Sequence, residues 1–194
     1  MQILSDVLRR RKPLDAALGA CDGLDPRDAG FARAIASETL RRLGQLEDLI
    51  RRFVPKPPAR NRAGPVPEIL LAGACELMFL EVPPHAAVDG ANRLAQADQK
   101  AVHFKPLINA VLRRIAREGG AVIAAQDAAA LNVPDWLFAR WIDSYGEDTA
   151  RAIAAAHQGV PPLDFIGNGA AVIAETGPLF GPVFRRQDPV RVDT

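Results

Sequence analysis

Aromatic residues and cysteines are scarce in this sequence. Among 194 residues there are one tyrosine, two tryptophans and two cysteines, whereas alanine is abundant. Tyrosine and tryptophan favour β-strands, and alanine loses no side-chain entropy in a helix, so this composition favours an all-α fold. Hydrophobic residues make up 48% of the chain and charged residues 24%, which is typical of a globular protein and argues against disorder.

The few cysteines and histidines do not form a ligand set. Cys21 and Cys75 stand among apolar residues of helical segments, as buried free thiols commonly do. His85, His103 and His157 are too far apart in the sequence to give zinc-ligand spacing. We therefore expect no metal site. We also expect no disulfide scaffold, because a chain of this length can build its own core.

Long apolar runs and catalytic motifs are missing as well. No apolar run approaches the roughly 20 residues that cross a bilayer, and the N-terminus lacks the apolar core of a signal peptide. We therefore expect a cytoplasmic protein without membrane contact. The sequence contains no phosphate loop and no HExxH, GxSxG or CxxC motif, so we expect no catalytic residue.

Apolar residues with a helical period predict a series of helices. Asp25, Pro26 and Asp28 form a strong start signal for a helix that runs to about Leu43, where Gly44 ends or bends the chain. The other helical segments are expected over residues 3–11, 13–18, 46–53, 68–80, 85–96, 105–118, 121–130, 135–145 and 147–157.

Some of these segments carry more specific expectations. Residues 68–80 are apolar on nearly all sides, which predicts a central buried helix. Residues 55–67 contain five prolines and are expected to form a loop. The pair Gly119-Gly120 is expected to end the preceding helix. The large side chains placed on inward faces include Phe31, Leu94 and Trp136.

The last part of the chain has a different texture. Residues 163–166 and 171–173 predict short strands, and glycine, proline and valine are frequent around them. Gly167-Asn168-Gly169 could belong to a nucleotide-binding loop, but too little chain follows it for a Rossmann unit, so we interpret it as a turn. The predicted fold is therefore a helical bundle with a short irregular or β C-terminal tail.

Positive charge is concentrated in the first third of the chain. Residues 1–62 hold 13 Lys or Arg and 8 Asp or Glu, a net charge of +5, and the remainder holds 11 and 15, a net charge of −4. Basic surfaces attract phosphate, and the guanidinium group matches phosphate oxygens and stacks on bases. The residues alone leave RNA binding and protein docking equally open. The candidate RNA-binding residues are Arg9, Arg10, Arg11, Lys12, Arg33, Arg41, Arg42, Arg113, Arg114 and Arg117.

Four segments carry a resemblance to a known family. They are DPRDAGFARAIASETLRRLGQLEDLI, ELMFLEVPPHAAVDGANRLA, FKPLINAVLRRIAREG and NVPDWLFARWIDSYGEDTARAIAAAHQGVPPLDF. In this order they resemble the N-terminal region of the RsmB (Sun) family of ribosomal RNA small-subunit cytosine-C5 methyltransferases, over about residues 25–165. The stretches VPPHAAV and INAVLRR are the most specific. The part up to about residue 120 is similar to the all-helical transcription antitermination factor NusB.

The resemblance implies a division into parts. Residues 1–120 would form a NusB-like RNA-binding domain and residues 121–160 a helical extension, while residues 161–194 would be a linker or the stub of a missing methyltransferase domain. In the family, that separate domain binds S-adenosylmethionine and supplies the catalytic cysteine. Neither Cys21 nor Cys75 matches its motifs, so no cofactor is expected in this chain, and the chain alone is expected to be inactive.

Three functions remain open on this basis. The first is an RNA-binding domain that positions ribosomal RNA for a catalytic domain. The second is a NusB-like adaptor in transcription antitermination that docks a transcription or ribosome-assembly protein. The third is a folded fragment without a ligand. The first predicts an affinity for RNA that weakens as salt rises, because phosphate binding releases counterions.

Overall fold

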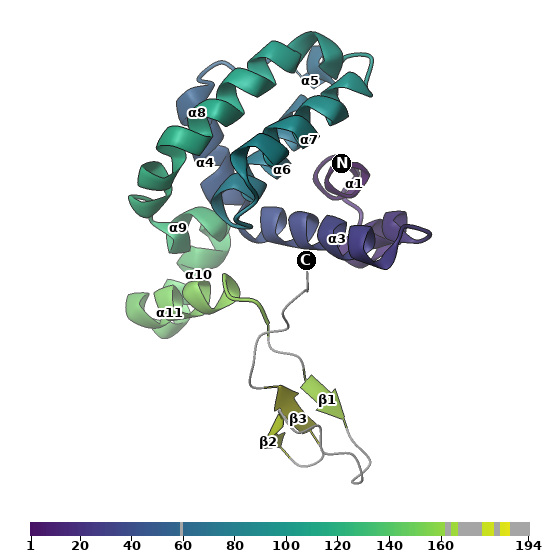
Figure 1. Ribbon diagram of the computed structural model, residues 1–194. Coiled ribbons are helices and arrows are strands. Elements are labelled where there is room, and N and C mark those ends of the chain that lie inside the picture. Colours follow the sequence, from purple (N-terminus) through teal and green to yellow (C-terminus); the bar gives the residue numbers. More distant parts are fainter. Residues whose placement is uncertain (59, 162–163, 167–175, 181–182, 187–194) are drawn as a thin grey trace.

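A computed structural model describes residues 1–58, 60–161, 164–166, 176–180 and 183–186. These residues form a helical body, followed by a small antiparallel sheet (Figure 1). The predicted helical bundle is thereby confirmed, and the three strands lie in the C-terminal tail that was predicted to be irregular or β. Within the described part of the chain, every helix is too short or too polar to traverse a lipid bilayer.

The body contains these α-helices: α1 (Gln2–Arg10), α2 (Leu14–Leu18), α3 (Pro26–Arg41), α4 (Leu43–Phe53), α5 (Arg60–Ala63), α6 (Val66–Met78), α7 (Pro84–Gln96), α8 (Lys105–Ala124), α9 (Ala128–Asn132), α10 (Asp135–Tyr145) and α11 (Glu147–His157). Two short 3₁₀ turns, Gly19–Cys21 and Ala101–Phe104, precede α3 and α8. The strands are β1 (Asp164–Ile166), β2 (Thr176–Phe180) and β3 (Val183–Arg186), in the order β1-β3-β2.

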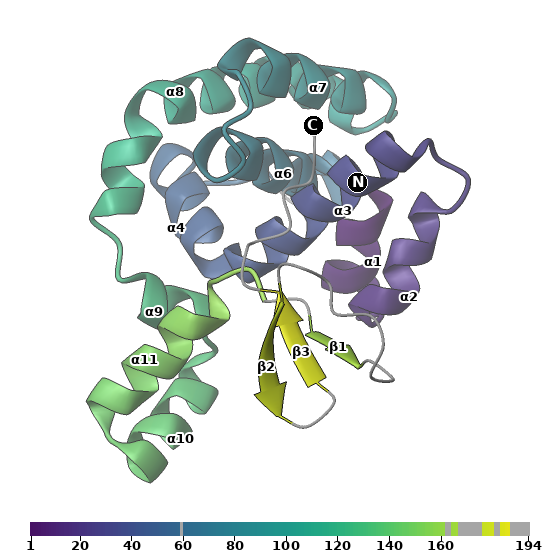
Figure 2. The ribbon, with the colours of Figure 1, turned by 60° about the horizontal axis from the view of Figure 1, so that its bottom comes forward.

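Helix α6 forms the centre of the body, as its apolar sequence predicts. Its residues from Glu68 to Cys75 are all buried, and it packs against α3, α4, α7 and α8 (Figures 1 and 2). Gly73 lets α8 approach closely, since a Cβ atom at this position would lie 2.7 Å from a methyl carbon of Leu112. A second, smaller apolar cluster joins α1, α2 and α3 to Ala72 on the same helix.

Local signals explain several boundaries. The Asp25 side chain accepts a hydrogen bond from the Arg27 amide at 3.0 Å, so the predicted cap of α3 is confirmed. Gly146, at φ 81°, separates α10 from α11, and α11 covers the predicted residues 147–157. The chain bends at Arg42, between α3 and α4, and Gly44 lies in the first turn of α4. Strand β1 falls within the predicted segment 163–166.

Two predictions about helix ends are wrong. Residues 55–67 are not only loop, because they include α5 and the first residues of α6. Proline is tolerated in a first helical turn, whose amides have no partner within the helix. Gly119-Gly120 does not end α8, which continues to Ala124. Gly119 is buried against Met78, where a Cβ atom would lie 2.8 Å from the sulfur, so tertiary packing outweighs the poor helix propensity of glycine.

Three large side chains expected inside are exposed. The exposed fractions are 43% for Phe31, 39% for Leu94 and 68% for Trp136, so their inward placement is wrong. Helix α7 buries a narrower stripe than a half-cylinder, and α10, which packs mainly against α11, has no buried residue. The predicted strand over residues 171–173 and the turn at residues 167–169 lie outside the described residues.

A bidentate ion pair joins α1 to the start of α6. Arg9 donates from Nε and Nη2 to the two carboxylate oxygens of Glu68, at 2.6 and 2.5 Å, and from Nη2 also to the Gly64 carbonyl oxygen. The Glu68 side chain is 1% exposed and the Arg9 side chain 29%. Because a buried carboxylate is costly without a partner, Arg9 contributes to the fold.

Truncation of this arginine provides a first test. We expect Arg9→Ala to lower the free energy of unfolding by about 2 to 4 kcal/mol, because it leaves the Glu68 carboxylate buried and unpaired. Replacing both partners, as in Arg9→Met with Glu68→Met, should recover most of that loss. Urea denaturation followed by circular dichroism measures both values. Equal stability of Arg9→Ala and the native chain would show that the pair contributes nothing.

A partly buried carboxyl group, that of Glu76, titrates near neutrality. Burial raises its pKa from 4.5 to about 7. The folded chain therefore holds a proton on Glu76 between these pH values that the unfolded chain has released. Consequently this group makes the free energy of unfolding decrease as pH rises through that window.

Removing the ionisable group should remove this decrease. We expect Glu76→Gln to be more stable than the native chain at about pH 8 and close to it at about pH 5. Denaturation curves at the two pH values measure the difference. Glu47→Gln, at an exposed position of α4, is the matched control and should show no such pH-dependent gain. A gain in Glu76→Gln that is the same at both pH values would contradict the assignment.

Candidate nucleic-acid interface

The ten candidate RNA-binding residues do not form one cluster. They lie at the C-terminal end of α1, in the middle of α3, at the junction of α3 with α4, and along α8. Helices α1 and α8 lie on opposite sides of α6 in both views (Figures 1 and 2). The structure also gives several of these residues partners within the chain, so their availability for an external ligand differs.

One exposed basic group is the α1 cluster, which we define as Arg10, Arg11 and Lys12. The Asp6 carboxylate accepts hydrogen bonds from Arg10 Nη1 at 2.8 Å and Lys12 Nζ at 2.9 Å. The hydrogen bond from Lys12 is the main cause that lowers the pKa of Asp6. With Arg11 exposed at the end of α1, three positive charges face one negative charge, a net charge of +2. This cluster can attract a polyanion.

Arg41 and Arg42 have partners within the protein. Both form ion pairs with Glu38, at 2.9 Å between Arg42 Nε and Oε1. Arg42 also donates to Gln158, from Nη1 to the side-chain oxygen at 2.8 Å and from Nη2 to the backbone carbonyl at 3.1 Å. Its guanidinium group lies over the Phe79 ring, 5.0 Å from the centroid. Arg42 therefore attaches the end of α11 to the body, and like Arg9 it stabilises the fold.

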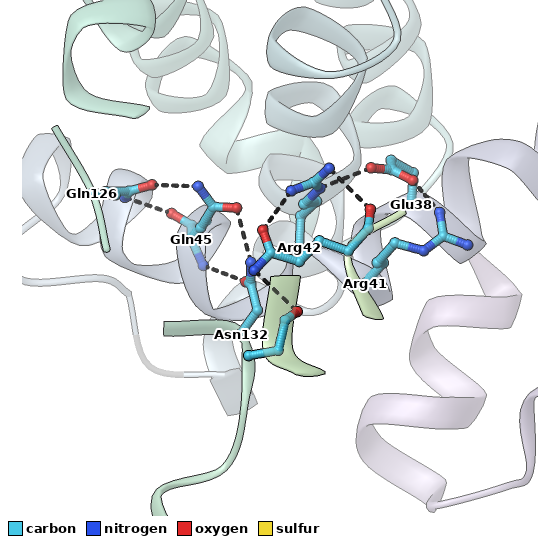
Figure 3. A network of polar contacts seen from close by, with 8 residues as sticks. Glu38, Arg41, Arg42, Gln45, Gln126 and Asn132 are labelled. Atoms are coloured by element: carbon cyan, nitrogen blue, oxygen red, sulfur yellow. Dashed lines mark hydrogen bonds and ion pairs between the residues drawn. The ribbon is translucent and has the colours of Figure 1, made fainter. Parts of the chain in front are cut away.

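A polar network continues from this junction to the helical extension (Figure 3). Gln45 is buried and lies between Gln126 and Asn132. Its backbone amide donates to Asn132 Oδ1 at 3.0 Å, and its Oε1 accepts from Asn132 Nδ2 at 2.8 Å. Its Nε2 donates to Gln126 Oε1 at 3.2 Å, and its backbone carbonyl accepts from Gln126 Nε2 at 3.0 Å. These four bonds fix α4 against the segment that precedes α9 and against the last residue of α9.

Gly44 is what allows the two segments to come so close. A Cβ atom at this position would lie 1.7 Å from the Leu131 carbonyl oxygen and 2.4 Å from its carbon. Real Cβ atoms do not approach backbone atoms to this distance, so any other residue would separate α4 from α9. The glycine that the sequence associates with a bend thus also serves a close backbone contact.

The arginines of α8 are exposed, and two of them line a hollow. Arg114 has partners: Glu118 Oε2 is 3.0 Å from its Nε, and its guanidinium group lies 4.9 Å from the centre of the Phe53 ring. Arg113 donates to Asn109 Oδ1 at 3.1 Å, and Arg117 lies 3.7 Å from Glu118. Between α7 and α8 is a hollow of about 620 Å³, lined by Pro84, His85, Val88, Asp89, Asn92, Arg113, Ala116 and Arg117.

Sequence reasoning missed the amide residues of these sites. Gln45 is polar, but it lies next to Leu46 on the buried side of its helix. This departure from the apolar pattern of the segment was a signal in the sequence that Gln45 has a polar partner. No sequence signal pointed to Asn92, since an asparagine in a helix is ordinarily exposed.

The remaining candidate, Arg33, is half exposed and lies 3.8 Å from an exposed Asp22, a contact too weak to fix its position.

The described residues do not fit S-adenosylmethionine. A site of the Rossmann kind needs parallel strands, each followed by a helix, whereas β1, β2 and β3 pair antiparallel. Burial raises the pKa of the Cys75 thiol to about 11, so this thiol stays protonated at neutral pH. Among the side chains that the structure places, no three His, Cys, Asp or Glu residues come together as a metal site requires.

The polar network yields a prediction about the helical extension. We expect Gln45→Ala to lower the free energy of unfolding by about 1 to 3 kcal/mol, because Gln126 and Asn132 lose their partners. Hydrogen exchange measured by mass spectrometry should be faster in α9 to α11 of the variant than in the same helices of the native chain. Exchange in α6 should change less. Gln99→Ala, which removes an exposed glutamine, is the control. Unchanged exchange in α9 to α11 would mean that the network does not hold the extension.

Comparison with known proteins gives a consistent answer. The NusB family matches residues 1–117. The chain is 32% identical over 164 residues to "Ribosomal RNA small subunit methyltransferase B" of Pasteurella multocida, covering 84% of this chain and 36% of the relative. The proteins of the same name from Sodalis glossinidius and Pseudomonas putida are 32% and 31% identical, over 81% and 82% of this chain and 37% of each relative.

The chain thus spans between a third and two fifths of the length of these curated relatives. None of the solved structures matches it significantly. The match over residues 1–117 includes α1 to α7 and most of α8, which together contain the central helix, the α1 cluster and the hollow between α7 and α8. With more than half of its residues covered in this way, the chain belongs to the NusB family.

Proposed function

We propose that this chain is the RNA-binding part of a ribosomal RNA small-subunit methyltransferase. The observation that carries the proposal is the similarity of more than four fifths of the chain to proteins of that name, of which it covers little more than a third. In this proposal residues 1–120 bind RNA, residues 121–160 form an extension, and residues 161–194 lead toward a catalytic domain. That domain would bind S-adenosylmethionine and methylate carbon 5 of a cytosine in the cytoplasm, where ribosomes assemble.

The charges of the described residues support the binding role. Of the ten candidate residues, Arg9, Arg41 and Arg42 are engaged within the fold, which leaves the α1 cluster, Arg33 and the α8 arginines for RNA. Exposed arginines and lysines with an excess over nearby carboxylates are suited to phosphate contacts. The chain would hold RNA in place, and bond formation would occur in another part of the protein.

Removal of two charges from the α1 cluster tests the proposal. We expect Arg10→Ala combined with Arg11→Ala to weaken binding of a fluorescently labelled fragment of small-subunit ribosomal RNA. The slope of log affinity against log salt should fall by about 1 to 2, because one or two phosphate contacts are lost. Stability should change by less than about 0.5 kcal/mol per exposed substitution. Fluorescence anisotropy at several salt concentrations measures the slope.

A charge-matched control shows whether the effect is specific to the α1 cluster. Arg51→Ala combined with Arg140→Ala removes two exposed arginines from α4 and α10 and should bind RNA like the native chain. In a separate methyl-transfer assay with S-adenosylmethionine, we expect this chain alone to transfer no methyl group to the RNA. Native-like binding by the α1 variant, or affinity that salt does not change, would count against the proposal.

A second candidate function rests on a different surface. Trp136 and Tyr145 on α10 are 68% and 60% exposed, and exposed aromatic side chains are common in protein interfaces. The chain could therefore act as an adaptor that docks a transcription or ribosome-assembly protein. Trp136→Ala would then abolish capture of that protein and leave RNA affinity unchanged.

A further inference from the structure

The C-terminal end of α1 lies beside two segments that are distant from it in the sequence. Arg9 Nη2 donates a hydrogen bond to the carbonyl oxygen of Gly64, which links α5 to α6. Gly64 in turn lies close to the loop after α7, since a Cβ atom at this position would be 2.9 Å from Asp98 Oδ1 and 3.1 Å from Lys100 Cβ. Lys100 Nζ donates to the Asn61 carbonyl oxygen of α5 at 3.1 Å. The end of α1, α5 and this loop therefore form one continuous surface.

Cations outnumber carboxylates on this surface. The segments 6–12, 61–65 and 97–101 carry six Lys or Arg, of which Arg9 is neutralised by Glu68. The other five are exposed, and we name them the basic surface: Arg10, Arg11, Lys12, Arg62 and Lys100. The acidic residues of the three segments are Asp6 and Asp98, so the net charge is +3. The sequence alone did not suggest the cations of α5 and of the loop, because only the fold brings them to α1.

Arg11 adopts a backbone conformation that is unfavourable for an arginine. Its φ is 53°, in the left-handed region where glycine or asparagine usually follows a helix. Within the described residues its side chain forms no ion pair that would offset this cost, and Arg9 and Arg10 already place positive charge in the last turn of α1. Unfavourable backbone conformations are common in ligand-binding sites. An arginine at this position is explained if its guanidinium group contacts a ligand.

The composition of the basic surface favours a phosphate backbone as that ligand. Three of its five cations are arginines, whose planar guanidinium groups match phosphate oxygens. Proteins read unpaired bases by stacking, most often on aromatic rings, and the segments 6–12, 61–65 and 97–101 contain no aromatic residue. Contacts to phosphate fix the position of a nucleic acid without carrying sequence information. The basic surface is thus suited to hold RNA and not to read it.

We propose that the basic surface binds the phosphate backbone of ribosomal RNA without regard to base sequence, with Arg62 and Lys100 extending the site beyond the α1 cluster. The inference rests on the proposed RNA-binding function and names the part of the RNA that this surface contacts. Recognition of a particular sequence is then left to other parts of the protein.

The test compares two RNAs that differ only in sequence. Fluorescence anisotropy at several salt concentrations is measured with a labelled fragment of small-subunit ribosomal RNA, and with an RNA of equal length and pairing whose bases are permuted. We expect the native chain to bind both with equal affinity, because phosphate contacts carry no sequence information. Arg62→Ala combined with Lys100→Ala should weaken both by the same factor and lower the slope of log affinity against log salt by about 1 to 2.

Two further comparisons separate loss of binding from loss of folding. Arg62 forms no ion pair within the described residues, so Arg62→Ala alone should stay folded and lower the slope by about 1. Arg51→Ala combined with Arg140→Ala removes two exposed arginines from α4 and α10 and should bind both RNAs like the native chain. Circular dichroism shows which variants are folded.

Arg11→Gly distinguishes a role in binding from a role in the fold. Glycine adopts the left-handed conformation readily, so the urea midpoint of unfolding should not fall. RNA binding should weaken and the salt slope should fall by about 1, because one phosphate contact is lost. A lower midpoint together with native RNA affinity would assign Arg11 to the fold and contradict the inference.

Three other results overturn the inference. They are an unchanged salt slope in folded variants of Arg62 and Lys100, a preference for the ribosomal fragment over the permuted RNA, and equally strong binding of labelled polyglutamate. The last result would identify an acidic polypeptide as the ligand, because such a chain lacks the dense counterion atmosphere of a nucleic acid. If the native chain binds neither RNA in dilute salt, the RNA-binding function itself is wrong.

Discussion

Helix α6 is apolar around nearly its whole circumference, and the rest of the body is arranged to enclose it. The helices α3, α4, α7 and α8 pack directly on it. Helix α1 is joined to the start of α6, because Arg9 forms an ion pair with the buried Glu68. This enclosure determines which charged groups remain free. An arginine that pairs with a buried group of the core is not available to a ligand, so the surface proposed for RNA consists of the cations that the core does not engage.

Much of this fold could be predicted from local sequence. The cap at Asp25, the stop at Gly146 and the apolar run of α6 each act within a few residues, and each appears in the structure. The errors came from contacts between distant segments. Gly119 stays helical because it packs against Met78, and Trp136 is exposed because α10 lies at the edge of the body. Neither neighbour can be inferred from residues adjacent in sequence.

For the candidate interface, the sequence predicted only a set of basic residues, and not how they are arranged in space. The sequence showed which residues are basic, but their partners lie far along the chain, as Glu68 does for Arg9 and Gln158 for Arg42. Ion pairs and amide contacts of this kind are properties of the folded chain. They divide one list of arginines into those that hold helices together and those that face solvent. The hollow beside Asn92 likewise exists only because α7 and α8 are neighbours.

The continuity of α8 has a consequence for how such chains can vary in length. This helix begins within the family match and runs seven residues past its end at residue 117, to Ala124. Each helical residue rotates the chain by about 100° around the helix axis and advances it by about 1.5 Å along that axis. One residue inserted after 117 would swing Gln126 and Asn132 away from Gln45 and carry α9 to α11 to another side of the body. Natural changes of length should therefore spare this stretch and fall in the loops beyond Ala124.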